Sequence, residues 1–381
     1  MSPAPPFVPP AYPYDRLDAA RALASVHDGG MVDLSIGTPC DPPPAAVVEA
    51  LSHSDAERGY PASIGSAALR EAAAAWIDRR FGVVVGAPTV AACIGTKEMV
   101  ATTPAWLRLR RPDRDTVLYP SVAYPSYEMG AILAGLRAVP VPVDADWRLD
   151  LAAVSADDAA RALLLWVNTP GNPAGQLDDL AAAARWGRER GVPVFSDECY
   201  AEFTWDGPPR TILETGLDGV IAVHSLSKRS NLAGVRVGFY AGDPDLVSYL
   251  SEVRKHAGFM VPGPVQAAAV VALGDQDHVE RQRDRYRTRL ERFAKVLAAV
   301  GASAELPGGG FYLWARAPED SPGDGAGEGA AWAFTARLAR QGGVLVSPGE
   351  FYGPAAAANV RVAMVAPDER LALVARRLGL E

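Results

Sequence analysis

Residues 219-GVIAVHSLSKRSNLAGVRVGFYAG-242 place a polar segment between two short runs of apolar residues. Continuously apolar runs of this length are typical of strands that are buried on both faces of a sheet. Lys228 stands in the polar segment, shortly after the first run. A lysine amine at the end of a strand can form a Schiff base with a carbonyl compound, or it can be an ordinary lysine in a solvated loop. The stretch alone supports the two interpretations equally.

The same pattern of short apolar runs extends over residues 90–240, and helical stretches separate most of the runs. This alternation predicts an α/β fold with a mostly parallel central sheet that helices flank. The runs are TVAACIG (89–95), DTVLYP (115–120), AVPVPV (138–143), ALLLWVN (162–168), VPVFSD (192–197), GVIAVHS (219–225) and VRVGFYAG (235–242).

The two ends of the chain differ from this central part. The Pro-rich residues 3–13 predict an extended arm, because proline fixes φ and interrupts helices and strands. After residue 243, a long charged helical region at about 265–300 precedes strand-like GGGFYLWA, a Gly/Pro/Asp-rich loop at 318–329, another helix and the strand VRVAMV, which predict a smaller α+β domain. We expect an arm (1–14), an N-terminal part of the small domain (15–45), a large domain (46–275) and a C-terminal part of the small domain (276–381). Further helices are expected at 15–27, 44–53 and 66–81.

Side chains near Lys228 have the chemistry of a phosphate site. Ser225 and Ser227 stand beside it in SLSK, and Arg236 follows eight residues after it. Hydroxyl groups and the planar donor fork of arginine bind phosphate oxygens. The motif GTKE at 95–98 opens a predicted helix, whose free N–H groups suit a phosphate or simply belong to a strand-to-helix turn. Its spacing is not that of a GxxxxGK[ST] loop, which disfavours nucleoside triphosphate binding.

Polar residues follow other predicted strands. Asp197 ends VPVFSD, with Tyr200 three residues later, and the carboxylate could pair with a ring nitrogen of a cofactor or cap a helix. Asn172, in NTPGNPAG, either reaches a ligand or belongs to an ordinary turn. Because ligands bind outside the carboxyl ends of strands in open α/β sheets, we expect these motifs to converge on one site.

Three more residues remain open on local grounds. Tyr124 in AYPSY either stacks on a ring or fills the core, and Tyr60 in GYPASIG is equally ambiguous. Arg361 in NVRVAMV either binds a substrate carboxylate through two parallel hydrogen bonds or forms a surface ion pair.

Composition narrows the classes of function. The net charge of −8, without a basic stripe, argues against a nucleic-acid partner. Three cysteines without CxxC spacing and five scattered histidines argue against disulfides and a metal site. There is no signal peptide and no apolar run long enough for a membrane span, so we expect a cytoplasmic protein. Lysine occurs only at residues 97, 228, 255 and 295, and we interpret the last two as surface charges.

Taken together, the motifs resemble the class I/II aminotransferases of PLP fold type I, which depend on pyridoxal 5′-phosphate (PLP). They occur in the family's order, from GYP at 59–61 through GTKE, AYPSY, NPAG, SDECY and SLSK to the late Arg361, and the resemblance covers about residues 30 to 370. It implies a homodimer with the active site at the subunit interface. A dehydrogenase is disfavoured because no GxGxxG follows an early strand.

The resemblance also implies roles for the motif residues. Lys228 holds PLP as a Schiff base and moves the proton, Asp197 pairs with the pyridine nitrogen, and Arg361 binds the substrate α-carboxylate. The other implied contacts are Asn172 and Tyr200 at the phenolic oxygen, Tyr124 on the ring, Gly95, Thr96, Ser225, Ser227 and Arg236 at the phosphate, Tyr60 at the phosphate of the neighbouring subunit's cofactor, Gly37 and Asn172 near the substrate, and Lys97 in the cofactor site without an assigned role.

Three stretches narrow the resemblance to the actinobacterial N-succinyldiaminopimelate aminotransferases of lysine biosynthesis: HSLSKRSNLAG, VRKHAGFMVPGPVQAA and SPGEFYGPA. Those enzymes transfer an amino group from glutamate to N-succinyl-2-amino-6-ketopimelate. The motifs equally fit another amino-acid aminotransferase or a PLP enzyme of secondary metabolism. Glutamate and N-succinyl-2-amino-6-ketopimelate both carry a distal carboxylate. Arg229, beside Lys228, either contacts such a carboxylate or is a surface or interface arginine.

Overall fold

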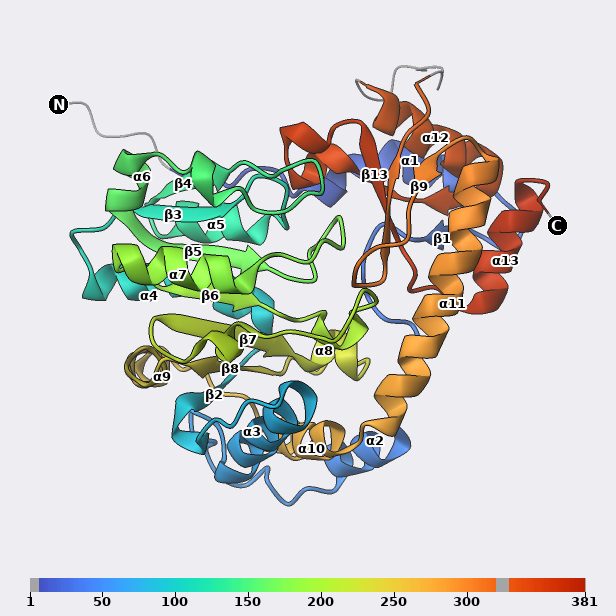
Figure 1. The fold of residues 1–381 in the computed structure, drawn as a ribbon. Coiled ribbons are helices and arrows are strands. Elements are labelled where there is room, and N and C mark those ends of the chain that lie inside the picture. Colours follow the sequence, from blue (N-terminus) through green and yellow to red (C-terminus); the bar gives the residue numbers. More distant parts are fainter. Residues whose placement is uncertain (1–6, 320–328, 381) are drawn as a thin grey trace.

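The computed structural model describes residues 7–319 and 329–380, and these residues form two lobes (Figure 1). In the larger lobe, the seven apolar runs form the strands of one sheet in the order β2-β8-β7-β6-β5-β3-β4. The strands are β2 (Val90–Cys93), β3 (Thr116–Pro120), β4 (Arg137–Val141), β5 (Ala162–Asn168), β6 (Val194–Asp197), β7 (Val220–Ser225) and β8 (Gly238–Gly242).

Strand direction confirms the prediction of a mostly parallel sheet. β4, β3, β5, β6 and β7 pair in parallel, whereas β8 is antiparallel to both β7 and β2. The connection from β7 to β8 contains only one short helix, α8 (Leu226–Arg229). A crossover to a parallel neighbour usually contains a longer helix, and here β8 returns antiparallel to β7.

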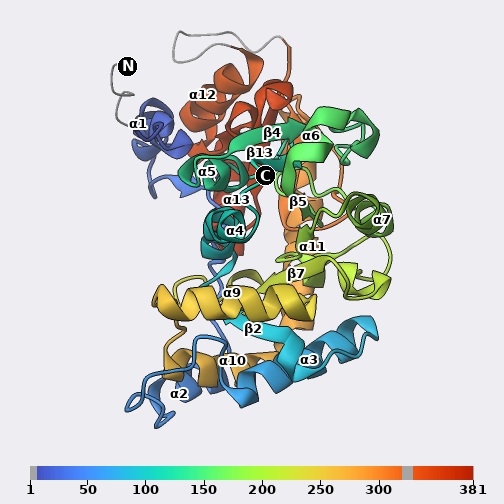
Figure 2. The same cartoon turned by 90° about the vertical axis from the view of Figure 1, so that its left-hand side faces the viewer.

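Helices cover both faces of the sheet, which explains why its strands are apolar on both sides. α4 (Thr96–Arg110), α5 (Ser126–Leu133) and α9 (Pro244–His256) pack on one face. α3 (Ala67–Phe81), α7 (Leu180–Arg190) and α10 (Gly263–Gly274) pack on the other. Figure 2 shows α4 and α5 on one side of the sheet and α7 on the opposite side.

The smaller lobe has the predicted α+β composition. Its four-stranded antiparallel sheet has the order β12-β13-β10-β9, and β1 pairs in parallel with β11. α1, near the N-terminus, packs against α12, near the C-terminus, so the lobe combines both ends of the chain (Figure 1). The strands are β1 (Val32–Asp33), β9 (Ser303–Ala304), β10 (Tyr312–Arg316), β11 (Val344–Leu345), β12 (Ser347–Pro348) and β13 (Asn359–Ala363), and the helices are α1 (Asp18–Ser25), α11 (Asp277–Ala299), α12 (Ala330–Gly342) and α13 (Asp368–Arg377).

Two helical predictions gain detail in the structure. The predicted helical region at about 265–300 is confirmed and consists of two helices, α10 and α11. α10 ends at Gly274, and Asp275 then accepts a hydrogen bond from the N–H of His278 at the start of α11. The helix expected at 15–27 begins as a 3-10 turn, Pro13–Leu17, and is α-helical only over Asp18–Ser25. Most of the loop predicted at 318–329 lies outside the described residues.

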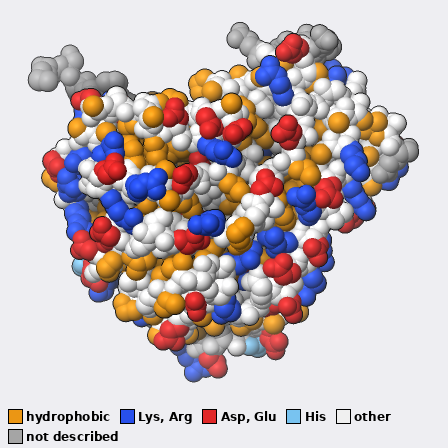
Figure 3. Space-filling view, viewed as in Figure 1, with side chains coloured by type: hydrophobic (Ala, Val, Ile, Leu, Met, Phe, Trp, Pro, Cys, Tyr) orange, Lys and Arg blue, Asp and Glu red, His pale blue; other side chains and the backbone are white. Residues whose placement is uncertain are grey.

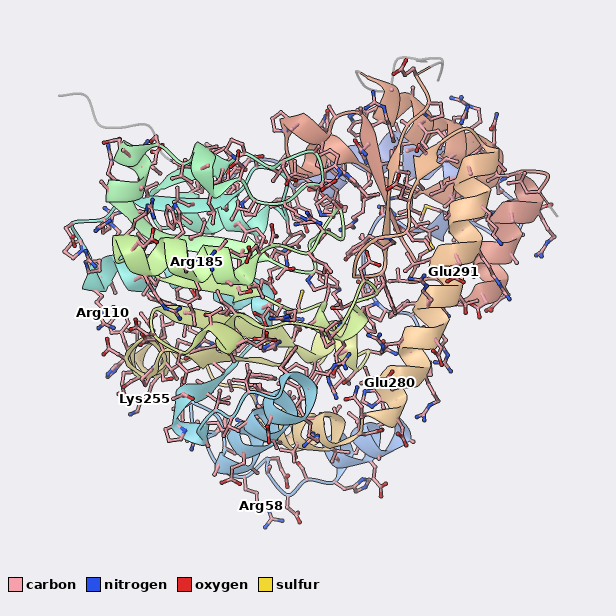
Figure 4. All side chains as sticks on the ribbon, viewed as in Figure 1. Arg58, Arg110, Arg185, Lys255, Glu280 and Glu291 are labelled. Carbon is pink, nitrogen blue, oxygen red and sulfur yellow. The ribbon has the colours of Figure 1, made fainter. Side chains whose placement is uncertain are left out.

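Basic and acidic side chains are intermixed over the face seen in Figure 3. Figure 4 labels several charged residues of the outer helices, among them Lys255 on α9. Lys255 is exposed and pairs with Glu252 at 3.3 Å, and Lys295 is also exposed, which confirms the interpretation of both as surface lysines. None of the helices in the described ranges is long and apolar enough to cross a membrane.

Candidate active site

A cavity of about 420 Å³ lies where the polar motifs leave the carboxyl ends of the strands. Residues of the smaller lobe, among them Tyr312 and Arg361, close its other side. The structure brings these predicted residues together in the lining: Gly37, Thr96, Lys97, Tyr124, Asn172, Asp197, Tyr200, Ser225, Ser227, Lys228, Arg236 and Arg361.

Lys228 extends into this cavity from α8, the single helical turn that follows β7. The Ser225 hydroxyl caps the turn by accepting a hydrogen bond from the N–H of Ser227 at 3.1 Å. The Lys228 Nζ donates to the carbonyl oxygen of Gly37, which comes from the segment after β1. The amine therefore reaches across the cavity from one lobe to the other.

Asp197 is the last residue of β6 and is buried at the cavity wall. Its Oδ2 accepts a hydrogen bond from the Tyr127 hydroxyl at 3.0 Å, and its Oδ1 accepts one from the N–H of Cys199 at 3.3 Å. Burial raises the pKa of this carboxyl group, and the two hydrogen bonds oppose the increase. A carboxylate in such a place is suited to pair with a cationic partner inside the cavity.

A cradle for an anion lies at the N-terminus of α4. Gly95 has a positive φ of 81°, a conformation that favours glycine, and a β-carbon there would displace Nη2 of Arg236. Arg236 has a positive φ of 63°, a conformation that costs a non-glycine residue about 1–3 kcal/mol and is concentrated at functional sites. Arg236, Thr96, Ser225 and Ser227 line the cavity and supply donors beside the start of this helix. Gly95 is the N-cap residue of the helix and does not itself line the cavity.

Asn172 and Tyr200 line the cavity, but both also contact side chains of the smaller lobe. The Asn172 Oδ1 accepts a hydrogen bond from Nη1 of Arg361 at 2.8 Å. The Tyr200 hydroxyl is 2.8 Å from the hydroxyl of Tyr312. Tyr124 is half-buried after β3, with the ammonium of Lys97 5.6 Å from its ring centre.

Two predicted residues have contrasting positions. Arg361 on β13 is 1% exposed, and its Nη2 also donates to the carbonyl oxygen of Ser35. It is therefore a buried arginine facing the cavity and not one of a surface ion pair. Tyr60 is fully exposed and does not line the cavity, so its role toward a neighbouring subunit stays a prediction.

Arg229, considered for a distal carboxylate, lies neither in the cavity nor at the surface. It is buried behind Lys228, where its Nε donates to Glu202 at 3.0 Å. The carboxylate of Glu202 also pairs with Arg80 at 2.7 Å and accepts a hydrogen bond from Trp76 at 2.8 Å. This cluster connects α8, which contains Arg229, to α3, which contains Trp76 and Arg80.

Sequence reasoning missed four tyrosines of the cavity wall. Tyr127 binds Asp197, and Tyr312 contacts Arg361. Tyr12 and Tyr14 come from the Pro-rich segment that the sequence suggests is an extended arm. The repeated tyrosines in AYPYDR were a weak signal, since large aromatic residues in a solvated arm would have no partner.

Comparisons with known proteins agree with this geometry. The family model described as aminotransferase class I and II matches residues 29–378. The chain is 42% identical over 377 residues to 4-dedimethylamino-4-oxo-anhydrotetracycline transaminase OxyQ of Streptomyces rimosus, covering 97% of this chain and 99% of that protein. It is 43% identical over 378 residues to probable aminotransferase Rv1178 of Mycobacterium tuberculosis, covering 97% and 85%.

A solved structure, of a probable N-succinyldiaminopimelate aminotransferase from Thermus thermophilus, superposes with a TM-score of 0.83 at 31% identity and covers 97% of this chain and 100% of that one. The chain belongs to the class I and II aminotransferases, and it uses PLP as its cofactor. The narrower resemblance to N-succinyldiaminopimelate aminotransferases stays a prediction, because the relatives include OxyQ at higher identity.

The cavity contains groups that fit each part of PLP. The cradle of Gly95 and Arg236 has the donors that a phosphate needs, and the buried carboxylate of Asp197 suits a protonated ring nitrogen. Lys228 supplies the amine that a carbonyl requires. These residues would hold the cofactor with its phosphate at the start of α4.

Titration of Lys228 gives a first testable expectation. Burial lowers the pKa of its amine from the usual 10.5 to about 8. Since only the neutral amine attacks a carbonyl, the rate of covalent PLP attachment to the cofactor-free protein should rise with pH up to about 8 and level off above it. Stopped-flow absorbance across pH 6–11 measures this rate. A rate that keeps rising toward pH 10.5 would show an amine with an ordinary pKa.

Proposed function

We propose that this chain is a glutamate-dependent aminotransferase whose acceptor is a keto acid with distal carboxylates, N-succinyl-2-amino-6-ketopimelate. The observation that carries the reaction class is the convergence of Lys228, Asp197 and Arg361 on one cavity. An amine, a buried carboxylate and a buried guanidinium are what the transfer of an amino group between two carboxylic acids requires.

The reaction then assigns a task to each of these side chains. Arg361 binds the substrate α-carboxylate and so orients the Cα–H bond toward Lys228. When bound, PLP withdraws electrons from the substrate Cα. Asp197 keeps a proton on the ring nitrogen, which sustains that withdrawal. The Lys228 amine takes the proton from the Cα of the donor and passes it to the cofactor. With the acceptor it carries a proton in the opposite direction, to the acceptor Cα.

A second cationic group supports a substrate with a distal carboxylate. Lys97 lies in the cavity lining with its ammonium 5.1 Å from the ring centre of Tyr12 and 5.6 Å from that of Tyr124. Within the described ranges, Lys97 forms no ion pair. An exposed lysine between two aromatic rings can turn toward an incoming carboxylate without breaking an existing salt bridge.

The comparisons support this acceptor only by analogy. The Thermus thermophilus structure bears the name of the proposed activity, whereas OxyQ bears the name of a transaminase for a tetracycline intermediate. The cavity wall formed by Tyr12, Tyr14 and Tyr124 would also suit a flat polycyclic ketone, which makes the OxyQ substrate the second candidate.

An acceptor panel tests the proposed substrate. We expect kcat/KM with glutamate as donor to be highest for N-succinyl-2-amino-6-ketopimelate among keto acids that differ in length and distal charge. A preference for 4-dedimethylamino-4-oxo-anhydrotetracycline would contradict the proposed acceptor and favour the second candidate. Lack of turnover with any pair of amino and keto acids would contradict the whole proposal.

The Lys97→Met variant tests the distal contact. A hydrogen bond to a charged group contributes roughly 1.5–3 kcal/mol, so KM for the proposed acceptor should rise about 10- to 100-fold. KM for a monocarboxylic keto acid should not change. Lys255→Met, which removes a surface lysine, is the matched control. An equal loss with both acceptors would assign Lys97 to cofactor binding and not to the distal carboxylate.

We also propose that the chain acts as a homodimer. Tyr60 supports this proposal, because its side chain is fully exposed although tyrosine usually buries much of its ring. A neighbouring subunit would cover Tyr60 and bring its hydroxyl to that subunit's phosphate cradle.

A further inference from the structure

The guanidinium of Arg361 lies between two aromatic rings. Its central carbon is 4.3 Å from the ring centre of Tyr312 and 4.9 Å from that of Tyr352. Arginine is attracted to aromatic faces, and the attraction is stronger where water is excluded. Arg361, Tyr312 and Tyr352 are all buried, so the two rings fix the plane of the guanidinium.

Each of these rings is held in turn by the hydroxyl of another tyrosine. Tyr200 holds Tyr312, with their hydroxyl oxygens 2.8 Å apart. Tyr14 holds Tyr352, with a distance of 2.9 Å. The first pair joins the loop after β6 to β10. The second pair joins the N-terminal segment to the short 3-10 helix Gly349–Tyr352, across nearly the whole length of the chain.

The N-terminal segment contacts this short helix at three points. Besides the hydroxyl pair, the ring of Tyr14 lies edge-on against Phe351 with centres 5.5 Å apart. Arg16 forms an ion pair with Glu350 at 2.6 Å. The backbone oxygen of Tyr352 accepts a hydrogen bond from the N–H of Ala123 at 2.8 Å. Tyr352 is therefore fixed between the N-terminal segment and the loop that follows β3.

The orientation of Arg361 matters because two of the five N–H groups of a guanidinium are already used within the protein. Nη1 donates to Asn172 and Nη2 donates to Ser35, while Nε has no partner within the described residues. A carboxylate that binds through two parallel hydrogen bonds needs the guanidinium plane in one orientation. Rotation of the guanidinium would misalign the donors that remain.

We propose that Tyr14 and Tyr352 are positioning residues of the substrate carboxylate site: their hydroxyl pair fixes the ring that orients Arg361, so the N-terminal segment sets the affinity for the α-carboxylate. The proposal rests on the proposed role of Arg361. It gives Tyr14 a role beyond enclosing the cavity. Tyr14 acts on Arg361 through its hydrogen bond to Tyr352 and through the ring of Tyr352.

Hydroxyl deletions test the pair. In the PLP-loaded enzyme, Tyr14→Phe and Tyr352→Phe should each raise the Kd of maleate, a dicarboxylate that cannot be transaminated, by about 2- to 10-fold. The double variant should lose no more than Tyr352→Phe alone, because Tyr352→Phe already removes the hydrogen bond to Tyr14, together with that of the Tyr352 hydroxyl to Ser347. KM for glutamate should rise in parallel with little change in kcat. Isothermal titration calorimetry and steady-state kinetics measure these values.

The ring itself is tested by Tyr352→Leu, which should raise the Kd of maleate by about 30-fold. Tyr240→Phe is a matched control, since Tyr240 also has a buried hydroxyl pair, with Ser251 at 3.1 Å, and an arginine beside its ring, but lies outside the cavity. It should leave the Kd unchanged. Thermal unfolding checks that each variant is folded, and Tyr352→Phe keeps the ring if Tyr352→Leu does not fold.

Additive losses in the double variant, or no change in the Kd of maleate in either single variant, would overturn the proposal. Arg361→Lys separates this failure from failure of the proposed function. If Arg361→Lys weakens maleate binding while the tyrosine variants do not, only the positioning role is wrong. If Arg361→Lys binds maleate as the original chain does, Arg361 is not the carboxylate site and both proposals fail.

Discussion

Lys228→Ala is expected to lower turnover by about 10⁴-fold or more. The variant loses both the amine that holds the cofactor and the group that moves the proton at the substrate Cα, and a positioned general base alone contributes up to about 10⁴-fold. The long-wavelength absorbance of lysine-bound PLP should disappear at the same time. Steady-state assays and absorbance spectra of the purified variant measure the two effects.

The matched control is Lys255→Ala, because Lys255 is exposed on α9 and pairs only with Glu252 in the structure. Its turnover and spectrum should equal those of the original chain. Borohydride reduction followed by peptide mass analysis identifies the modified lysine. A reducible lysine adduct that persists in Lys228→Ala would refute the assignment of this site.

The convergence of the motifs could be predicted because it follows from sheet geometry. Continuously apolar runs indicate strands buried on both faces, and parallel strands bring their carboxyl ends to one edge. Asp197 and Ser225 end neighbouring strands, and Lys228 follows within one helical turn. Asp197 and Lys228 themselves therefore appear in the sequence at short offsets from strand ends.

The tyrosines around Arg361 could not be predicted in the same way. Tyr14 and Tyr352 meet because α1 packs on α12 and the chain ends share one lobe, which no local pattern records. The Pro-rich composition before Tyr14 predicts an extended arm. It does not indicate that Tyr14 contacts Tyr352. Similarly, Arg229 is interpreted from the sequence as a contact for a distal carboxylate or as a surface or interface arginine. Its partner in the structure, Glu202, lies in a different motif, so the sequence near Lys228 does not indicate the contact.

Asp197→Asn is expected to lower turnover by about 10²- to 10³-fold while leaving the fold intact. The amide has nearly the same shape as the carboxyl group, but it cannot stabilise a proton on the ring nitrogen, and loss of one partner of a buried ion pair costs roughly 3–5 kcal/mol. The loss should appear mainly in kcat, since the substrate contacts of Arg361 are unchanged. Steady-state kinetics and thermal unfolding measure the two quantities.

Asp178→Asn provides the matched control for this variant. Asp178 is half-buried, and desolvation of its carboxyl group raises the pKa to about 6, but it lies outside the cavity and accepts a hydrogen bond from the N–H of Leu149 at 2.8 Å. It should change stability without changing kcat. A PLP analogue that is methylated at the ring nitrogen carries a permanent positive charge and should restore part of the activity of Asp197→Asn. If the analogue restores nothing and Asp178→Asn loses as much activity, then Asp197 acts through the packing of β6 and not through the ring nitrogen.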